Sequence, residues 1–177
     1  MEKMNKPTLY WSLLKFKDWN FHIASTTKSL VFIGSQYKPF EELVEWATKH
    51  FPGCPLVEDA EKLEPFVVEI TQYLDGRRKT FTIPFKYVGT PFQLAVWRAL
   101  CDIPYGQTKS YSDIANDINK PTAVRAVGAA IGANPILITV PCHRVIGKND
   151  SLTGYRGGLE MKTWLLDLEK RVSLNIE

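Results

Sequence analysis

The sequence predicts a mixed α/β protein whose first half alternates strands with helices and whose second half is mostly helical. Three observations support this. Short β-branched and aromatic runs in the first half are separated by amphipathic stretches that end at glycine. In the second half, a threonine and a serine each open a helical pattern with a capping partner three residues later. A hydrophobic content of 45% in 177 residues is enough for one large core or two small ones.

The first half contains three predicted strands and two predicted helices. Residues 21–34 form two short strands around a polar turn at 25–28. Residues 39–53 and 63–76 each form an amphipathic helix, stopped by Pro52-Gly53 and Gly76 respectively. Residues 79–85, KTFTIPF, are expected to form a further strand. No phosphate-binding loop, catalytic carboxylate pair or repeat occurs here, so this half is expected to be a supporting unit.

The second half begins with the segment TPFQLAVWRALCDIP. Thr90 is the expected N-cap, Pro91 occupies the first helical position, and Gln93 completes a capping box. The core face of this helix is formed by Phe92, Val96, Ala99 and Leu100.

Two further helices are expected across residues 110–134. In the first, Ser110 caps with Asp113. Its apolar face is formed by Tyr111, Ile114, Ala115 and Ile118. After the short break KPTA, residues 124–134 resume a helix. Two short helices joined by about four residues indicate a helix-turn-helix.

The second helix of this pair has an unusual exposed face. Val124, Val127 and Ile131 form its expected buried stripe. Opposite them Arg125 shares a face with small residues, namely Gly128, Ala129 and Gly132. Glycine inside a helix costs about 1 kcal/mol relative to alanine. Close packing of a second helix would explain the small residues but not the cation. We therefore favour a face that presses on a nucleic acid, with Arg125 probing the base stack.

Composition excludes several classes of protein. The formal charge is +3, and all of it lies in residues 86–177, which hold 11 Lys+Arg against 8 Asp+Glu. This imbalance is weak evidence for a nucleic-acid partner. The N-terminal segment lacks the apolar core of a signal peptide, and no run is long enough to span a membrane. The three widely spaced cysteines and the isolated His22 and His50 predict neither a disulfide framework nor a metal site. We expect a cytoplasmic protein with no membrane association.

The segment ITVPCHRVIG places Cys142 beside a histidine. This thiol could be a buried structural residue, a metal or disulfide partner, or a nucleophile. Pro141 should end the strand ILITV, so that Cys142 and His143 lie in a turn and can face one pocket. His143 could then take the thiol proton. Glu169 stands at the edge of the apolar face of a helix over 159–171, formed by Met161, Trp164, Leu165 and Leu168. From spacing alone, Glu169 is expected at the surface.

Five segments occurring in order across residues 89–169 resemble the O6-alkylguanine-DNA alkyltransferase family. They are GTPFQLAVWRAL, IPYGQTKSYSDIA, PTAVRAVGAAIGANP, PCHRVIG and GYRGGLEMKTWLLDLE. The resemblance implies a ribonuclease-H-like α/β domain over residues 1–85 and a mostly helical, winged helix-turn-helix-like domain over 86–177. It also implies direct repair of O6-alkylguanine in double-stranded DNA by a single-turnover methyltransferase. Activity on O4-alkylthymine is left open.

The resemblance also implies roles for the residues around Cys142. Cys142 would be the nucleophile and alkyl acceptor, and His143 would deprotonate it through a water. Glu169 would orient His143, which reverses the assignment made from spacing. Asn134 would be the hinge between the recognition helix and the active-site loop.

The DNA-contacting and pocket residues are inferred in the same way. Arg125 would fill the gap left by a flipped base, and Tyr111 would press on the adjacent phosphate. Ala126, Gly128 and Ala129 would lie against the DNA. Val145 would offer its carbonyl to the guanine amino group. Tyr155 and Arg156 would begin the lid over the guanine.

Two positions depart from the family pattern. Asp150-Ser151 replaces a common glycine turn. Arg156 stands where a small or hydroxyl residue is frequent, which bears on the size of the alkyl group accepted. The cysteines of the zinc-containing members are missing, and no cofactor is expected because the thiolate itself takes the alkyl group. We expect a monomer, with cooperative DNA binding left open. Two alternatives remain, a DNA-binding protein that recognises the lesion without chemistry and a cysteine hydrolase.

Overall fold

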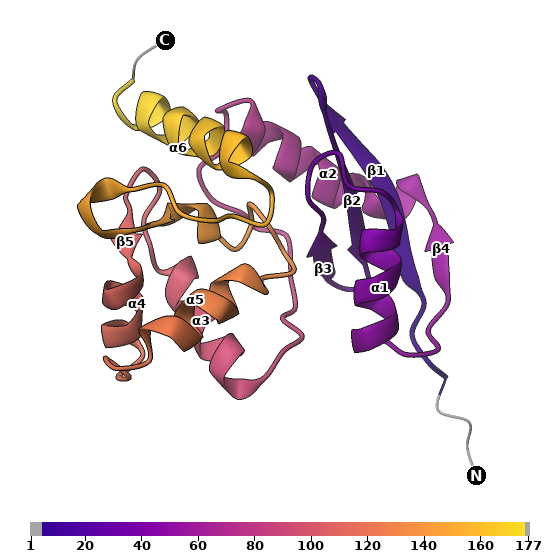
Figure 1. Cartoon of the computed structure of the whole chain (residues 1–177). Helices are drawn as coiled ribbons and strands as arrows, with labels where there is room; N and C mark the ends of the chain where they lie inside the picture. The colour runs from indigo at the N-terminus through magenta and orange to yellow at the C-terminus, as the bar shows by residue number, and fades with distance from the viewer. Residues whose placement is uncertain (1–4, 176–177) are drawn as a thin grey trace.

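The computed structural model describes residues 5–175 (Figure 1), so the first four residues of the charged N-terminal segment lie outside it. The N-terminal half is built on a four-stranded sheet in the order β3-β2-β1-β4. Its strands are β1 (Leu9–Phe16), β2 (Trp19–Ser25), β3 (Leu30–Ile33) and β4 (Leu56–Glu58). The first three are antiparallel neighbours, and β4 pairs with β1 in parallel.

One helix covers each face of this sheet. Helix α1 (Glu41–His50) packs Leu43 and Ala47 against Ala24 and Phe32. Helix α2 (Ala60–Leu74) packs on the opposite face, where the side chains that alternate with these along the strands point. The side chain of Asp59 caps α2 by accepting the Lys62 amide at 3.1 Å.

The C-terminal half is mostly helical. It contains α3 (Pro91–Cys101), α4 (Tyr111–Asp117), α5 (Val124–Gly132) and α6 (Leu159–Ser173). It also contains a short parallel pair, β5 (Lys109–Ser110) with β6 (Val145–Ile146), and two 3-10 turns, η1 (Cys142–Arg144) and η2 (Lys148–Asp150). The capping boxes predicted at Thr90–Gln93 and Ser110–Asp113 are both present. None of the helices within residues 5–175 is long and apolar enough to cross a bilayer.

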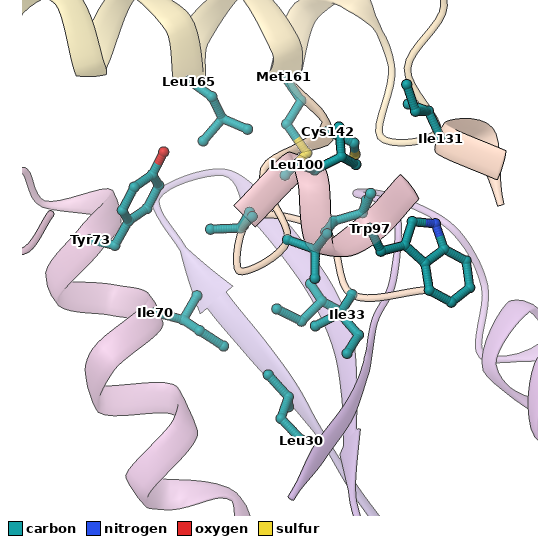
Figure 2. Close-up of a cluster of buried hydrophobic side chains, with 14 of the residues drawn as sticks. Leu30, Ile33, Ile70, Tyr73, Trp97, Leu100, Ile131, Cys142, Met161 and Leu165 are labelled. Carbon is teal, nitrogen blue, oxygen red and sulfur yellow. The ribbon is translucent and has the colours of Figure 1, made fainter. Parts of the chain in front are cut away.

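A continuous hydrophobic core joins the two halves. Figure 2 shows Leu30 and Ile33 of the sheet and Ile70 of α2 on one side of this core, facing the buried residues of the helical half. The edge of β3 continues the contact, because the amide of Ile33 donates to the carbonyl of Pro135 at 2.9 Å. The segment that leads to Cys142 is therefore bonded directly to the N-terminal sheet.

The predicted fold class is confirmed, but several elements differ from the sequence-based expectation. Strands β1 and β4 were not predicted, and α2 begins at Ala60 rather than at residue 63. Residues 79–85 do not form a strand. Pro84 has no amide to donate, and the amides of Thr82 and Ile83 donate to the carboxylate of Glu69 instead of to a neighbouring strand.

Two predictions in the second half were also wrong. The run ILITV (136–140) is a buried turn and not a strand. Its Ile138 has a positive φ of 70°, and the amide of Val140 bonds back to the carbonyl of Ile136 at 3.1 Å. On α5 the buried stripe contains Val127, Ala130 and Ile131, whereas Val124 is 37% exposed. Val124 is the first residue of this helix.

Candidate active site

Cys142 opens the turn η1 and is almost completely buried, with 3% of its surface exposed. Figure 2 shows it beneath α6, close to Met161 and Leu100. The side-chain amide of Asn134 donates to its sulfur at 3.2 Å and to the carbonyl of Val140 at 3.0 Å. The side-chain oxygen of Asn134 accepts the amide of Ile136 at 3.0 Å. Asn134 thus fixes both ends of the turn that delivers Cys142.

The environment of Cys142 contains opposing electrostatic effects. Burial raises the pKa of the Cys142 thiol. The hydrogen bond from Asn134 and the positive charges of Arg156 and Lys162 act against this increase without cancelling it. In the closed site the sulfur is therefore a thiol, and a base is needed to form the nucleophilic thiolate.

His143 is the neighbouring base and is completely buried. Its Nε2 lies 2.6 Å from Oε2 of Glu169. Burial lowers the pKa of His143, although the hydrogen bond and charge of Glu169 oppose that effect. A neutral imidazole must donate from Nε2 to the carboxylate, so Nδ1 carries the free lone pair. Among the described residues Nδ1 has no hydrogen-bond partner, which leaves it available to accept a proton.

Glu169 is 1% exposed and is held as an anion by hydrogen-bond donors from four residues. They are His143 Nε2, Arg144 Nε at 2.7 Å, Arg144 Nη2 at 3.1 Å, the Gly106 amide at 3.0 Å and the Tyr73 hydroxyl. Burial alone would raise the pKa of Glu169, but the hydrogen bonds from His143 and Arg144 and the positive charge of Arg144 lower it to about 2. The surface position expected from spacing was therefore wrong, and Glu169 is placed to orient His143.

Tyr73 of α2 is a member of this network that the sequence analysis did not identify. Its hydroxyl donates to Oε2 of Glu169 and lies 3.2 Å from Nε2 of His143. Burial and the nearby Glu169 charge raise the pKa of Tyr73 well above its usual value, so the hydroxyl stays protonated. The expected supporting half therefore contributes a side chain to the site. In the sequence, Tyr73 was indistinguishable from other apolar positions of an amphipathic helix.

The segment 154–158 lies beside Cys142 and connects to α6. The hydroxyl of Tyr155 is buried without a partner among residues 5–175. Gly157 is required here, because a Cβ atom would lie 2.6 Å from the Tyr155 ring and 2.7 Å from the Met161 sulfur. Gly158 has a φ of +93° at the start of α6. The absence of a side chain at Gly157 therefore leaves the space that the Tyr155 ring and the Met161 sulfur occupy.

Val145 and Lys162 form a second buried polar contact that the sequence did not reveal. Lys162 is 1% exposed, and its Nζ donates to the carbonyl of Val145 at 2.6 Å and to that of Thr153 at 3.2 Å. Burial lowers the pKa of Lys162. The carbonyl expected to face guanine is therefore already a hydrogen-bond acceptor, and one lone pair is left for a second donor.

The residues expected to contact DNA lie on α4 and α5. Tyr111 begins α4, and its hydroxyl lies 2.6 Å from that of Thr153. Arg125, Ala126 and Ala129 are exposed on α5. A Cβ atom on Gly128 would meet only the Tyr111 ring, at 3.8 Å, and one on Gly132 would meet nothing within 4 Å. Packing within the described chain therefore does not require either glycine.

Arg156 does not project freely into the space beside Cys142. Its guanidinium donates to the carbonyls of Ile33 and Asn134 and to the hydroxyl of Ser35. The Arg156 side chain therefore contacts the N-terminal half and the hinge, and the pocket role expected for it stays a prediction. Within residues 5–175, no group of three or more His, Cys, Asp and Glu side chains is arranged to hold a metal.

Family models match both halves of the chain. Residues 9–87 match the ribonuclease-like domain of 6-O-methylguanine DNA methyltransferase, and residues 91–171 match its DNA-binding domain. The chain is 79% identical to the inducible methylated-DNA–protein-cysteine methyltransferase of Bacillus subtilis, over 98% of this chain and 97% of the relative. The chain belongs to the methylated-DNA–protein-cysteine methyltransferase family.

The chain is also similar to a second curated relative and to a solved structure. The methylated-DNA–protein-cysteine methyltransferase of Methanosarcina mazei is 48% identical over 85% of this chain and 96% of its own. The crystal structure of Mycobacterium tuberculosis OGT in complex with DNA matches with a TM-score of 0.79 and 35% identity, covering 92% of this chain and 94% of that one. The family assignment therefore rests on both halves of the chain.

Proposed function

We propose that this methyltransferase repairs O6-alkylguanine in DNA by transferring the alkyl group to the sulfur of Cys142. The observation that carries this assignment is the buried series Asn134–Cys142 and His143–Glu169, in which a thiol is hydrogen-bonded at one side and followed by an oriented base. Such an arrangement suits a nucleophile activated by proton transfer to histidine. The relatives described above are named for their action on methylated DNA, which supports methylated DNA as the alkyl donor.

The reaction balances without a cofactor. His143 Nδ1 takes the Cys142 proton, directly or through one water, and Glu169 stabilises the imidazolium through Nε2. The thiolate then attacks the alkyl carbon in line with the C–O6 bond. The new S–C bond forms as the C–O6 bond breaks, and the electron pair of the C–O6 bond leaves on guanine. The proton that His143 took from Cys142 passes to the guanine anion, directly or through water, which restores the neutral imidazole. The product on the protein is a thioether.

Burial of Cys142 supports base flipping as part of this proposal. A cysteine with 3% of its surface exposed is out of reach of a base stacked in a duplex. A flipped base would enter beside Tyr155, Arg125 would fill the gap in the stack, and Tyr111 would press on the phosphate. The small, unpacked face of α5, with Ala126, Gly128 and Ala129, suits a recognition helix of a helix-turn-helix.

The partner proposed is double-stranded DNA, bound by a protein monomer in the cytoplasm. The three free cysteines fit a reducing compartment. The backbone carbonyl of Val145 is proposed to accept a hydrogen bond from the guanine amino group with its remaining lone pair, in addition to the one from Lys162.

Intact mass spectrometry after incubation with an O6-methylguanine duplex tests the assignment. The expected result is a gain of one CH2 unit, mapped by peptide analysis to Cys142. Cys142→Ser should remove the adduct while the variant still binds DNA. An adduct on Cys54 or Cys101 would contradict the proposal. So would the absence of any adduct on the protein without substitutions. Hydrolysis of a chromogenic ester by the same protein would instead support a cysteine hydrolase.

A further inference from the structure

Arg156 connects three separate parts of the molecule. Its Nη2 donates to the carbonyl of Ile33 at 2.7 Å, its Nε to the carbonyl of Asn134 at 3.1 Å, and its Nη1 to the hydroxyl of Ser35 at 3.3 Å. Nη1 also lies 3.5 Å from Oε2 of Glu42. One planar guanidinium thus bridges the end of β3, the start of α1 and the hinge before the cysteine turn.

The contact is reciprocal and sheltered. The hydroxyl of Ser35 donates to the backbone carbonyl of Arg156 at 3.0 Å, and the Ser35 amide donates to Glu42 at 2.7 Å. The guanidinium also lies over the ring of Phe32, 5.4 Å from its centroid. Ser35 and Phe32 are each 2% exposed. A surface arginine rarely finds this many fixed acceptors, so the side chain has one well-defined position.

The two segments held by Arg156 both bear on Cys142. Asn134, whose carbonyl accepts from Arg156, donates its side-chain amide to the Cys142 sulfur. Tyr155, the preceding residue, has a buried hydroxyl without a partner in the described part of the chain. Because Ile33 also bonds to Pro135, the hinge lies between β3 and the segment 154–158.

We propose that Arg156 is a positioning residue that clamps the lid segment 154–158 and the Asn134 hinge to the N-terminal half, and so holds the lid closed over Cys142. Its side chain acts through the lid and hinge, not by narrowing the space for the alkyl group. Only the expected effect of Arg156 on catalysis rests on the proposed alkyl transfer. The clamp itself can be measured without any alkylated substrate.

Alkylation of Cys142 by iodoacetamide measures lid opening, because the reagent must reach the buried sulfur. Peptide mapping separates its adduct from those of Cys54 and Cys101. In Arg156→Ala we expect Cys142 to be labelled about tenfold faster or more, given the strength of hydrogen bonds to a charged group. Transfer from free O6-benzylguanine should slow at the same time. Faster labelling together with slower alkyl transfer at Cys142 would indicate a displaced lid. A change in the reactivity of the thiol itself would move both rates in the same direction.

Three further variants test the clamp. Ser35→Ala, on the other half of the molecule, should speed labelling by a smaller factor. The double variant should be labelled no faster than Arg156→Ala alone, because both residues belong to one contact. Arg156→Lys keeps the charge but cannot bridge three acceptors, so its labelling should resemble that of Arg156→Ala. Arg77→Ala, which removes an exposed arginine, is the matched control and should resemble the unmodified protein.

Four results would overturn the clamp. The first is unchanged Cys142 labelling in Arg156→Ala. The second is a normal labelling rate of Cys142 in Arg156→Lys, which would show that the positive charge alone is sufficient. The third is full additivity of the effects of Ser35→Ala and Arg156→Ala on the labelling rate. The fourth is equal acceleration at Cys54 with a lower melting temperature, which would indicate general unfolding. If the unmodified protein accepts no alkyl group from DNA but the labelling pattern holds, the proposed function fails and the clamp stands.

Discussion

The side-chain amide of Asn134 lies 3.2 Å from the sulfur of Cys142 and is its only hydrogen-bond donor among residues 5–175. The same amide reaches the carbonyl of Val140, so one side chain closes the turn and contacts the nucleophile. A hydrogen bond to sulfur favours the thiolate over the thiol. Asn134 therefore links the shape of the loop to the reactivity of the thiol.

Replacing Asn134 by alanine should make Cys142 less reactive near neutral pH. The amide opposes the effect of burial on the pKa of Cys142, so its loss should raise that pKa further and shift the pH profile of alkyl transfer toward higher pH. Rates with free O6-benzylguanine across a pH series measure the shift. Asn116→Ala, on the exposed side of α4, is the control. An unchanged profile in Asn134→Ala would show that the amide has only a structural role.

The substitution Glu169→Gln should lower the free energy of unfolding at neutral pH, and it should lower it by less in acid. The pKa of Glu169 is about 2 in the folded protein against 4.5 as its ordinary value, so the anion stabilises the fold above pH 4.5. This contribution is lost as the pH falls from about 4.5 toward about 2. Breaking a buried pair costs about 3 to 5 kcal/mol.

Urea unfolding of both proteins from pH 7 to pH 3 measures this difference. The gap between their free energies of unfolding should be largest at neutral pH and should shrink below pH 4.5. A gap that stays constant with pH would mean that the loss comes from packing and not from the charge of Glu169.

The sequence identified the site better than it identified the elements that build it. Cys142, His143 and Asn134 lie in short segments whose order is characteristic of the family, and the structure brings them together. Glu169 could be assigned only through that resemblance, since its burial depends on Tyr73 and Arg144, which come from distant positions. Helical spacing shows which residues lie on the same face of a helix, but it does not show which other part of the chain covers that face.

The two segments wrongly predicted as strands share a physical cause. Segments 79–85 and 136–140 have strand-like composition, but a side chain accepts some of their amides, those of Thr82 and Ile83 at Glu69 and that of Ile136 at Asn134. Strand β4 has three residues and depends on pairing with β1. Such non-local partners leave no periodic pattern in the chain.

Arg125→Ala should slow repair of duplex DNA far more than the reaction with free O6-benzylguanine. Arg125 is exposed on α5, away from the buried turn that holds Cys142, so only a step at the base stack should depend on it. Single-turnover rates with both substrates provide the comparison. Arg98→Ala, an exposed arginine on α3, is the control. An equal loss with both substrates would indicate damage to the active site instead.

Gly128→Ala should change stability and DNA binding in opposite directions. A Cβ atom at this position makes ordinary contact with Tyr111 at 3.8 Å, and alanine in a helix is favoured over glycine by about 1 kcal/mol. The melting temperature should rise by about 2 to 4 °C. Affinity for duplex DNA should fall, because the face of α5 becomes less flat. A lower melting temperature, or unchanged DNA affinity, would contradict this account of the glycine.

The alkylated protein should be inactive and less stable than the unmodified one. A thioether on Cys142 has no nearby group that can displace it, so repaired DNA should reach a plateau at one equivalent per protein. The sulfur is packed beneath α6 against Met161 and Leu100 (Figure 2), and overpacking a core of this kind costs about 1 to 3 kcal/mol. The alkyl group also displaces the Asn134 amide, which ties the turn together. Differential scanning calorimetry before and after reaction should show a lower melting temperature, with Cys142→Ser exposed to the same DNA as the control. Steady repair beyond one equivalent would refute the single-turnover mechanism, and an unchanged melting temperature would show that the site already has room for the alkyl group.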